Sequence, residues 1–269
     1  GIVMGTAMAG IATIAYTQEA LTGASHKKVG PRFIPKILGN IAAANIAIDY
    51  DIQGPSFTVS TACSSGGDAI NTACMCMQSG KADIMLAVGA ESVLCPLVIY
   101  SLANAKALSR RNDSPSTASR PFDVTRDGFV IGEGGGALVL ETEESANGRN
   151  ARKYAEIKGY AQAHRPVSYD NSEVDSKAVV EVIEKACVNA GIEADNIDFV
   201  CCDDRKIIKT LMPCYDVSQE IGNARAAASA MTAAYAAELL SDREKNYEYG
   251  LALSMGAGGT YSAVILKKA

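Results

Sequence analysis

The chain has 269 residues, of which 48% are hydrophobic and 6% are aromatic, and this is enough to bury the core of one large domain or of two tightly packed halves. Its formal net charge is −5 and its Lys and Arg residues are scattered, which excludes the basic footprint of a nucleic-acid-binding protein. No segment approaches about 18 uninterrupted apolar residues, so we predict no transmembrane helix and no membrane partner.

The first third of the chain is predicted to alternate strands with helices. Apolar side chains recur at helical spacing within 33–49, which predicts one helix there. Small and apolar residues follow a helical pattern again from Cys63 to Met77. Three apolar or β-branched runs predict strands, at residues 1–9, 56–62 and 82–91.

The rest of the chain continues this alternation after a polar, proline-containing loop at 107–129. Residues 176–191 form an amphipathic helical pattern that ends in Gly191, a residue suited to a left-handed helix cap. The alanine-rich segment 224–240 favours a further helix by its propensity. Strands are predicted within 134–146, 154–163, 197–202 and, as a hairpin with a glycine-rich turn, 249–268. Because the strands are apolar along their length, the sequence predicts an α/β fold whose sheets are covered on both faces.

The chain contains eight cysteines, which is too dilute for a disulfide scaffold in a protein of this size. None of them has CxxC spacing, and no nearby His completes a zinc-binding set. We therefore expect most of them to be small buried hydrophobic residues in a cytoplasmic protein, with no bound metal. They are Cys63, Cys74, Cys76, Cys95, Cys187, Cys201, Cys202 and Cys214.

Cys63 lies where a predicted strand turns directly into a predicted helix. The N-terminus of a helix presents unpaired backbone N–H groups and the positive end of the helix dipole. This field stabilises a thiolate, and the same N–H groups can hold the oxyanion that forms when a thioester carbonyl is attacked. Cys63 is therefore a candidate nucleophile. The local pattern fits equally well with a small buried residue that simply begins a helix.

The segment GPSFTVSTACSSGGDAI (54–70) resembles the nucleophile segment of the β-ketoacyl synthases, the condensing enzymes of fatty-acid and polyketide synthesis. Three later segments resemble that family in the same order, namely GKADIMLAVGAES (80–92), the stretch 107–141 and LSMGAGGTYSAVIL (253–266). The resemblance implies a thiolase-like α/β fold with the five layers α/β/α/β/α. It also implies a nucleophile-bearing half at 1–150 and a second half at 151–269.

The chain departs from the family pattern in length. The family's opening strand–helix region, which precedes the segment corresponding to GIVMGT, is absent, so the first half is expected to be partial. The connection between CCDD (201–204) and IGNARA (221–226) is shorter than in the family, so the second half is expected to be shortened. We therefore expect a fragment or a reduced relative.

The positions that correspond to the family's two catalytic His residues and its Lys carry other residues here. Asp203 stands where the first His is expected, Asn223 where the second His is expected, and Ser218 near the position of the Lys. In the family, both imidazoles are thought to stabilise the enolate that forms when malonyl carrier protein loses carbon dioxide. His26 and His164 lie outside the matching motifs and are expected to be ordinary exposed or loop residues.

Two further features take their interpretation from the resemblance. The turn MGAGG (255–259) corresponds to a Phe-Gly-Phe-Gly-Gly turn in the family, which implies that the backbone N–H of Ala257 contributes to the oxyanion hole although the aromatic gate is missing. The charged residues that precede the strand at 134 are expected to buttress the site through ion pairs. These are Asp123, Arg126, Asp127 and Glu133.

The resemblance implies acyl transfer in fatty-acid or polyketide synthesis, with Cys63 taking an acyl group from the phosphopantetheine thioester of an acyl carrier protein. Condensation is expected to be weak, because the anion at Asp203 repels a developing enolate and Asn223 is a weak donor. Two alternatives stay open: a non-catalytic partner resembling chain-length factors, and an ordinary condensing enzyme with segments missing from this chain. No cofactor is expected, and dimerisation, either as a homodimer or with a ketosynthase subunit, is expected through the nucleophile half.

Overall fold

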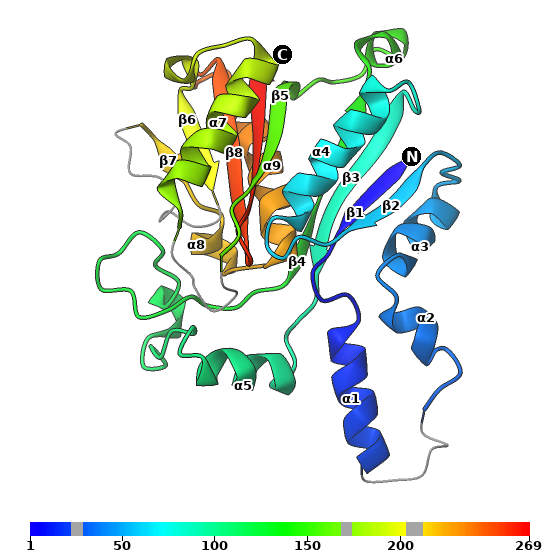
Figure 1. Cartoon of the computed structure of the whole chain (residues 1–269), viewed down its shortest axis with the longest axis vertical. Helices are drawn as coiled ribbons and strands as arrows, with labels where there is room; N and C mark the ends of the chain where they lie inside the picture. The colour runs from blue at the N-terminus through cyan, green and yellow to red at the C-terminus, as the bar shows by residue number, and fades with distance from the viewer. Residues whose placement is uncertain (23–28, 168–173, 203–211) are drawn as a thin grey trace.

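The computed structural model describes residues 1–22, 29–167, 174–202 and 212–269, in which two β-sheets and their helices form a layered α/β structure (Figure 1). The first sheet has the strand order β2-β1-β3-β4. Strand β1 is parallel to both of its neighbours, and β4 is antiparallel to β3. Its strands are β1 (Ile2–Gly5), β2 (Ser56–Val59), β3 (Ile84–Glu91) and β4 (Gly134–Glu141).

The second sheet has five strands in the order β5-β9-β8-β6-β7. The two long strands at its centre, β8 and β9, form the predicted antiparallel hairpin, and β6 is parallel to both β8 and β7. The sheet consists of β5 (Ala155–His164), β6 (Phe199–Cys202), β7 (Cys214–Tyr215), β8 (Tyr249–Gly256) and β9 (Thr260–Lys268).

Two helices, α4 (Ser65–Gln78) and α9 (Ala226–Ser241), lie between the sheets and contact strands of both (Figure 1). Helix α7 (Ser176–Ala190) packs on β5 and β9, and α3 (Ile41–Asp49) packs on β1 and β2. The layers therefore follow the order α/β/α/β/α, as the resemblance implied. Helix α7 ends as predicted, because Gly191 adopts a left-handed conformation with φ of 69°.

Strand β1 of the first sheet is apolar along its length because both of its faces are covered. On β1, Val3 belongs to the core that includes the central helices, whereas Ile2 and Met4 pack with Ala43 of α3 in a separate core. Successive side chains of a strand point to opposite faces, so the two cores divide along the alternation of β1. A continuous apolar run at this strand is thus a consequence of the layering.

Small residues allow the central layer to be thin. A Cβ atom on Gly66 of α4 would lie 2.7 Å from the backbone nitrogen of Ala230 and 2.8 Å from the backbone oxygen of Ala226, both on α9. These are backbone atoms, which cannot move aside as a flexible side chain can. The two central helices therefore cross in direct backbone contact at the first turn of α4, and any larger residue at this position would separate them.

Several elements differ from the sequence-based predictions. The helix predicted at 33–49 is interrupted at Leu38, which is extended with ψ of 128°, so that α2 (Phe33–Ile37) and α3 are separate. Three helices were not predicted, and they are α1 (Ile11–Thr22), α5 (Pro96–Asn104) and α8 (Ser218–Ile221). The acidic turn after β4 is the short helix α6 (Glu143–Gly148). Within the described ranges, no helix has both the length and the apolar content that a bilayer crossing needs.

Candidate active site

Cys63 is half-buried in the short bend that joins β2 to α4. The residue before it, Ala62, has φ of +55°, a left-handed conformation that non-glycine residues seldom adopt. This conformation makes the turn from strand to helix sharp. The predicted placement of a cysteine at the N-terminal end of a helix is therefore found in the structure.

Side-chain hydrogen bonds close the bend around Cys63. The Thr61 backbone N–H donates to Ser65 Oγ at 2.9 Å, and Ser65 Oγ donates to the Ala62 carbonyl at 2.5 Å. Ser64 Oγ donates to the Thr61 carbonyl at 2.8 Å. Every residue adjacent to Cys63 is thus held by a hydrogen bond within the bend, which fixes the backbone on both sides of the sulfur-bearing residue.

Two of the backbone amides that the sequence suggested for holding a thiolate are occupied by other atoms of the chain. The Ser65 N–H donates to the Ala62 carbonyl at 3.2 Å, and the Gly67 N–H donates to Ser229 Oγ at 3.0 Å. The positive end of the α4 dipole remains at Cys63, since it arises from the whole helix. Of the two features that the sequence suggested, the helix dipole is the one that these hydrogen bonds leave in place.

Ser229 of α9 ties the second half of the chain to the bend. Its Oγ donates to the Cys63 carbonyl at 3.1 Å while accepting from Gly67, and the residue is only 3% exposed. Sequence reasoning missed this residue because it lies in an alanine-rich helical pattern. The available signal was a hydroxyl directly flanked by Ala228 and Ala230 in an alanine-rich segment, since a buried hydroxyl needs a partner.

The glycine-rich turn between β8 and β9 lies directly against the bend. A Cβ atom on Gly256 would overlap the Thr61 carbonyl oxygen and lie 2.7 Å from Ser64 Oγ. The turn continues through exposed Ala257 to Gly258 and Gly259, whose φ angles are 92° and 93°. Ala257, which is expected to contribute to an oxyanion hole, thus directly follows Gly256, the residue that contacts the bend around Cys63.

Asn223 and Ser218, which stand near the expected positions of the family's second His and its Lys, make local hydrogen bonds with their own segment. Asn223 Oδ1 accepts from the Arg225 N–H at 3.0 Å, in the tight turn that leads into α9. Ser218 is 8% exposed, and its N–H donates to Asp216 Oδ1 at 2.8 Å. Neither side chain carries the charge of the group that it replaces. Asp203 lies outside the described residues.

His164 is exposed, as predicted, but it ends strand β5 and does not lie in a loop. Thr260 pairs with both His164 and Gly256 in the second sheet, and His164 Nδ1 lies 3.4 Å from Thr260 Oγ1. Directly opposed residues of antiparallel strands point to the same face of the sheet. The imidazole therefore lies on the same face of the sheet as the side chain of Thr260, at the end of the sheet where the glycine-rich turn joins β8 to β9. His26 lies outside the described residues.

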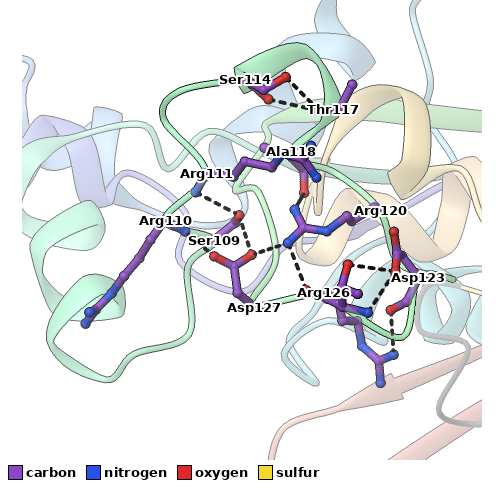
Figure 2. Close-up of polar contacts among 11 residues, drawn as sticks. Ser109, Arg110, Arg111, Ser114, Thr117, Ala118, Arg120, Asp123, Arg126 and Asp127 are labelled. Atoms are coloured by element: carbon purple, nitrogen blue, oxygen red, sulfur yellow. Dashed lines mark hydrogen bonds and ion pairs between the residues drawn. The ribbon is translucent and has the colours of Figure 1, made fainter.

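The long loop before β4 is organised by an ion pair (Figure 2). Arg120 donates to Asp127 Oδ1 and to the Thr125 carbonyl, both at 3.0 Å. Asp127 also accepts from Ser109 Oγ at 2.7 Å and from the Arg110 N–H at 2.8 Å. The predicted ion pair is thus present for Asp127, and it joins two points of this loop.

The other charges of this region act through hydrogen bonds in the described part of the chain. Asp123 Oδ1 accepts from the backbone and the hydroxyl of Thr125, and the Asp123 carbonyl accepts from Arg126 Nη1. Glu133 accepts from Ser92 Oγ at 3.1 Å and from the Leu94 N–H at 3.2 Å. For these groups the predicted ion pairs are replaced by hydrogen bonds to neutral groups.

The loop is attached to the segment that leads into α9. Ser119 Oγ donates to the Ser218 carbonyl at 2.5 Å. Asn223 donates its N–H to the Val130 carbonyl at 2.7 Å and accepts from the Gly132 N–H at 2.9 Å. These contacts fix the positions of Ser218 and Asn223 from outside their own segment, which is the architectural role that the sequence suggested.

Acid is expected to weaken this loop through Asp127. The hydrogen bonds from Ser109 Oγ and the Arg110 N–H lower the pKa of Asp127 to about 2, below the ordinary value of about 3.9. Its stabilising contribution is therefore complete above about pH 4 and is lost as the pH falls through about 2.

Urea unfolding should show a lower midpoint for Asp127→Asn than for wild type at neutral pH, and the difference should shrink between about pH 4 and about pH 2. A constant difference, or an equal change for Asp49→Asn on the exposed side of α3, would contradict this assignment.

Comparison with known proteins places these features in a family. Residues 1–146 match the family described as "Beta-ketoacyl synthase, N-terminal domain". The chain is 34% identical over 265 residues to 3-oxoacyl-[acyl-carrier-protein] synthase 2 of Vibrio cholerae, covering 98% of this chain and 61% of that protein. It is 37% identical over 201 residues to the synthase 2 of Rhizobium meliloti, covering 74% of this chain and 48% of that protein. The chain thus spans about half to three fifths of these relatives.

Solved structures share the fold over the whole chain. A β-ketoacyl synthase from Burkholderia phymatum has a TM-score of 0.89 at 24% identity, covering 100% of this chain and 75% of that one. A type II PKS acyl-carrier protein in complex with its ketosynthase bound to the hexaketide gives a TM-score of 0.86 at 26% identity, with coverage of 100% and 78%. Because residues 1–146 match the family domain and these structures share the fold, the chain belongs to the β-ketoacyl synthase family.

Proposed function

We propose that the chain is an acyltransferase of fatty-acid or polyketide synthesis that accepts an acyl group as a thioester on Cys63. The observation that carries this proposal is the contact of the glycine-rich turn at Gly256 with the bend that holds Cys63. A nucleophile at a helix N-terminus and a turn with accessible backbone amides are the two parts that acyl transfer needs. The division into a nucleophile-bearing half at 1–150 and a second half at 151–269 is part of the proposal.

The proposed step exchanges one thioester for another. The Cys63 thiolate attacks the carbonyl carbon of an acyl carrier thioester, and the negative charge moves to the carbonyl oxygen. The Ala257 N–H donates to this oxyanion. When the carbonyl re-forms, the bond to the carrier sulfur breaks, and the carrier thiolate leaves and takes up a proton. No oxidant, metal or cofactor enters this balance.

Condensation is expected to be slow in the same site. Asn223 can offer an enolate only a neutral amide donor, and Ser218 supplies no cation. An enolate would therefore lack the stabilisation that the two imidazoles are thought to give in the family, and each 1.4 kcal/mol of lost stabilisation slows a reaction about tenfold. The second alternative, an ordinary condensing enzyme with further segments, is supported by the coverage of only 61% of the Vibrio cholerae relative.

Partners are proposed from the same likenesses. One neighbour is a ketosynthase in complex with an acyl-carrier protein, and another is a ketosynthase/chain length factor, which supports a carrier protein and a second subunit as partners. The edge strand β2 and the helix before it expose large apolar side chains, with Phe57 at 44%, Ile48 at 77% and Tyr50 at 77%. This surface supports dimerisation through the nucleophile half, with a second copy or with a ketosynthase subunit.

The test uses the full chain with an acyl carrier thioester and malonyl carrier protein. Peptide mass spectrometry measures acyl-Cys63, and chromatography measures the β-ketoacyl product. Acylation without product is the expected result. Absence of both would favour the chain-length-factor role, and formation of both would favour the condensing enzyme.

A further inference from the structure

A buried carboxyl group lies directly behind the nucleophile bend. Asp68, in the first turn of α4, is only 2% exposed. Its Oδ2 accepts from Thr61 Oγ1 at 2.5 Å and lies 3.2 Å from Ser64 Oγ, so it contacts residues on both sides of Cys63. The acyl-transfer step described above makes no use of this group.

The environment of Asp68 is unfavourable for a carboxylate. Its Oδ1 is buried and accepts no hydrogen bond among the described residues. Gln162 and Ser262 lie near enough to lower the pKa in part, but neither makes a hydrogen bond of normal geometry with Oδ1. Burial dominates and raises the pKa of the Asp68 carboxyl above its ordinary value. A buried polar group with an unsatisfied oxygen costs stability, so this residue is not explained as a contribution to the core.

Of the two hydroxyl groups near Asp68 Oδ2, that of Ser64 also contacts the glycine-rich turn. Gly256 packs against the Thr61 carbonyl oxygen and Ser64 Oγ. Ser64 Oγ contacts both Asp68 and the atoms that face Gly256, since it lies 2.8 Å from the Thr61 carbonyl and 3.2 Å from Asp68 Oδ2. One carboxyl thus sits at the point where the nucleophile bend and the turn that carries Ala257 meet.

We propose that Asp68 is a positioning residue that, through Thr61 and Ser64, holds the Cys63 bend in register with the Ala257 turn. Its action is geometric, because it accepts a hydrogen bond from Thr61 and contacts Ser64, the residues on the two sides of the bend. The inference rests on the proposed function only in naming acyl transfer as the reaction that Cys63 performs. The reactivity of the Cys63 thiol is a property of the bend itself.

Rescue by a conservative variant separates positioning from charge. In Asp68→Asn, the amide oxygen still accepts from Thr61 and contacts Ser64, and the amide N–H groups face Gln162 and Ser262. In Asp68→Ala, both contacts are lost. We expect Asp68→Ala to slow the reaction of Cys63 roughly 10- to 100-fold, the range typical of a misplacement near 1 Å, and Asp68→Asn to restore the rate to within about threefold of wild type.

Two readouts are measured on the same proteins. The first is the rate of Cys63 alkylation by iodoacetamide, followed by peptide mass spectrometry, and the second is the rate of acylation by an acyl carrier thioester. The Thr61→Val variant removes the donor to Asp68, and the double variant Thr61→Val/Asp68→Ala should be no slower than the slower single variant, because the two groups act as one unit. Thr61→Val and Asp68→Asn keep the test decisive if Asp68→Ala does not fold.

The matched control is Asn71→Ala. Asn71 is buried in the next turn of α4, but its Nδ2 donates to the Ala161 carbonyl and to Ser262 Oγ, away from the bend. It should lower the urea midpoint without slowing Cys63. Equal slowing by Asn71→Ala, a wild-type rate in Asp68→Ala, or a slow Asp68→Asn would overturn the inference. Normal alkylation of wild type without acylation would instead overturn the proposed function. The alkylation rates of the variants would then still test whether Asp68 positions Cys63.

Discussion

Cys63→Ala is expected to abolish the acyl adduct while leaving the fold intact. The side chain is half-buried in a bend whose hydrogen bonds come from Thr61, Ser64 and Ser65, so removal of the sulfur leaves these contacts in place. The acceptor atom of the proposed transfer is lost, and no adduct should form on the peptide that contains residue 63. Intact-protein mass spectrometry after incubation with an acyl carrier thioester measures this, and urea unfolding checks the fold.

Cys214→Ser is the matched control for this variant. Cys214 is the other half-buried cysteine, and the remaining six are buried. It lies on β7, and its sulfur is 3.5 Å from that of Cys202, in a different part of the chain from the nucleophile bend. This variant should keep the full adduct. An adduct of normal yield on Cys63→Ala, or its loss in Cys214→Ser, would show that the acyl group is carried elsewhere.

Gly66→Ala is expected to destabilise the protein strongly. The added Cβ would lie 2.7 Å from the Ala230 nitrogen and 2.8 Å from the Ala226 oxygen, so α4 and α9 would have to move apart. Overpacking of this kind costs about 1–3 kcal/mol of unfolding free energy, and backbone atoms make the upper end of this range the expected value. Because Ser229 joins α9 to the Cys63 carbonyl, the same movement should slow acylation. Urea unfolding and the acylation rate measure the two effects.

Gly148→Ala provides the comparison for a glycine without close neighbours. A Cβ atom there meets nothing within 4 Å, and the residue lies in α6, where alanine is the better helix former. The unfolding midpoint should stay the same or rise slightly. If Gly66→Ala were as stable as Gly148→Ala, the close crossing of the central helices would be wrong.

Elements with a long, regular pattern were predictable from the sequence. The amphipathic run 176–191 became α7 with its Gly191 cap, and the alanine-rich run 224–240 became α9. In both, the signal is local, because helical periodicity and propensity are set by residues a few positions apart. The hairpin at 249–268 was predictable for the same reason, since its glycine-rich turn separates two apolar runs.

The predicted helix at 33–49 failed because packing overrides a continuous pattern. A Cβ atom on Gly10 would lie 2.7 Å from Cα of Ile37, so the end of α2 is pressed against the start of α1. The chain then becomes extended at Leu38 before α3 turns onto the first sheet. The periodicity was right on both sides of this break and gave no sign of it.

The alternation of strands and helices, the bend that carries Cys63, and the resemblance to the β-ketoacyl synthases follow from the order of residues alone, because they depend on neighbours in the chain. The contacts of Gly256 and Ser229 with that bend, and the burial of Asp68 behind it, are visible only in the folded protein. Ser229 and Cys63 are 166 positions apart, and their contact exists because two sheets enclose the same pair of helices. Such contacts follow from how the layers pack together, and no local pattern of residues specifies them.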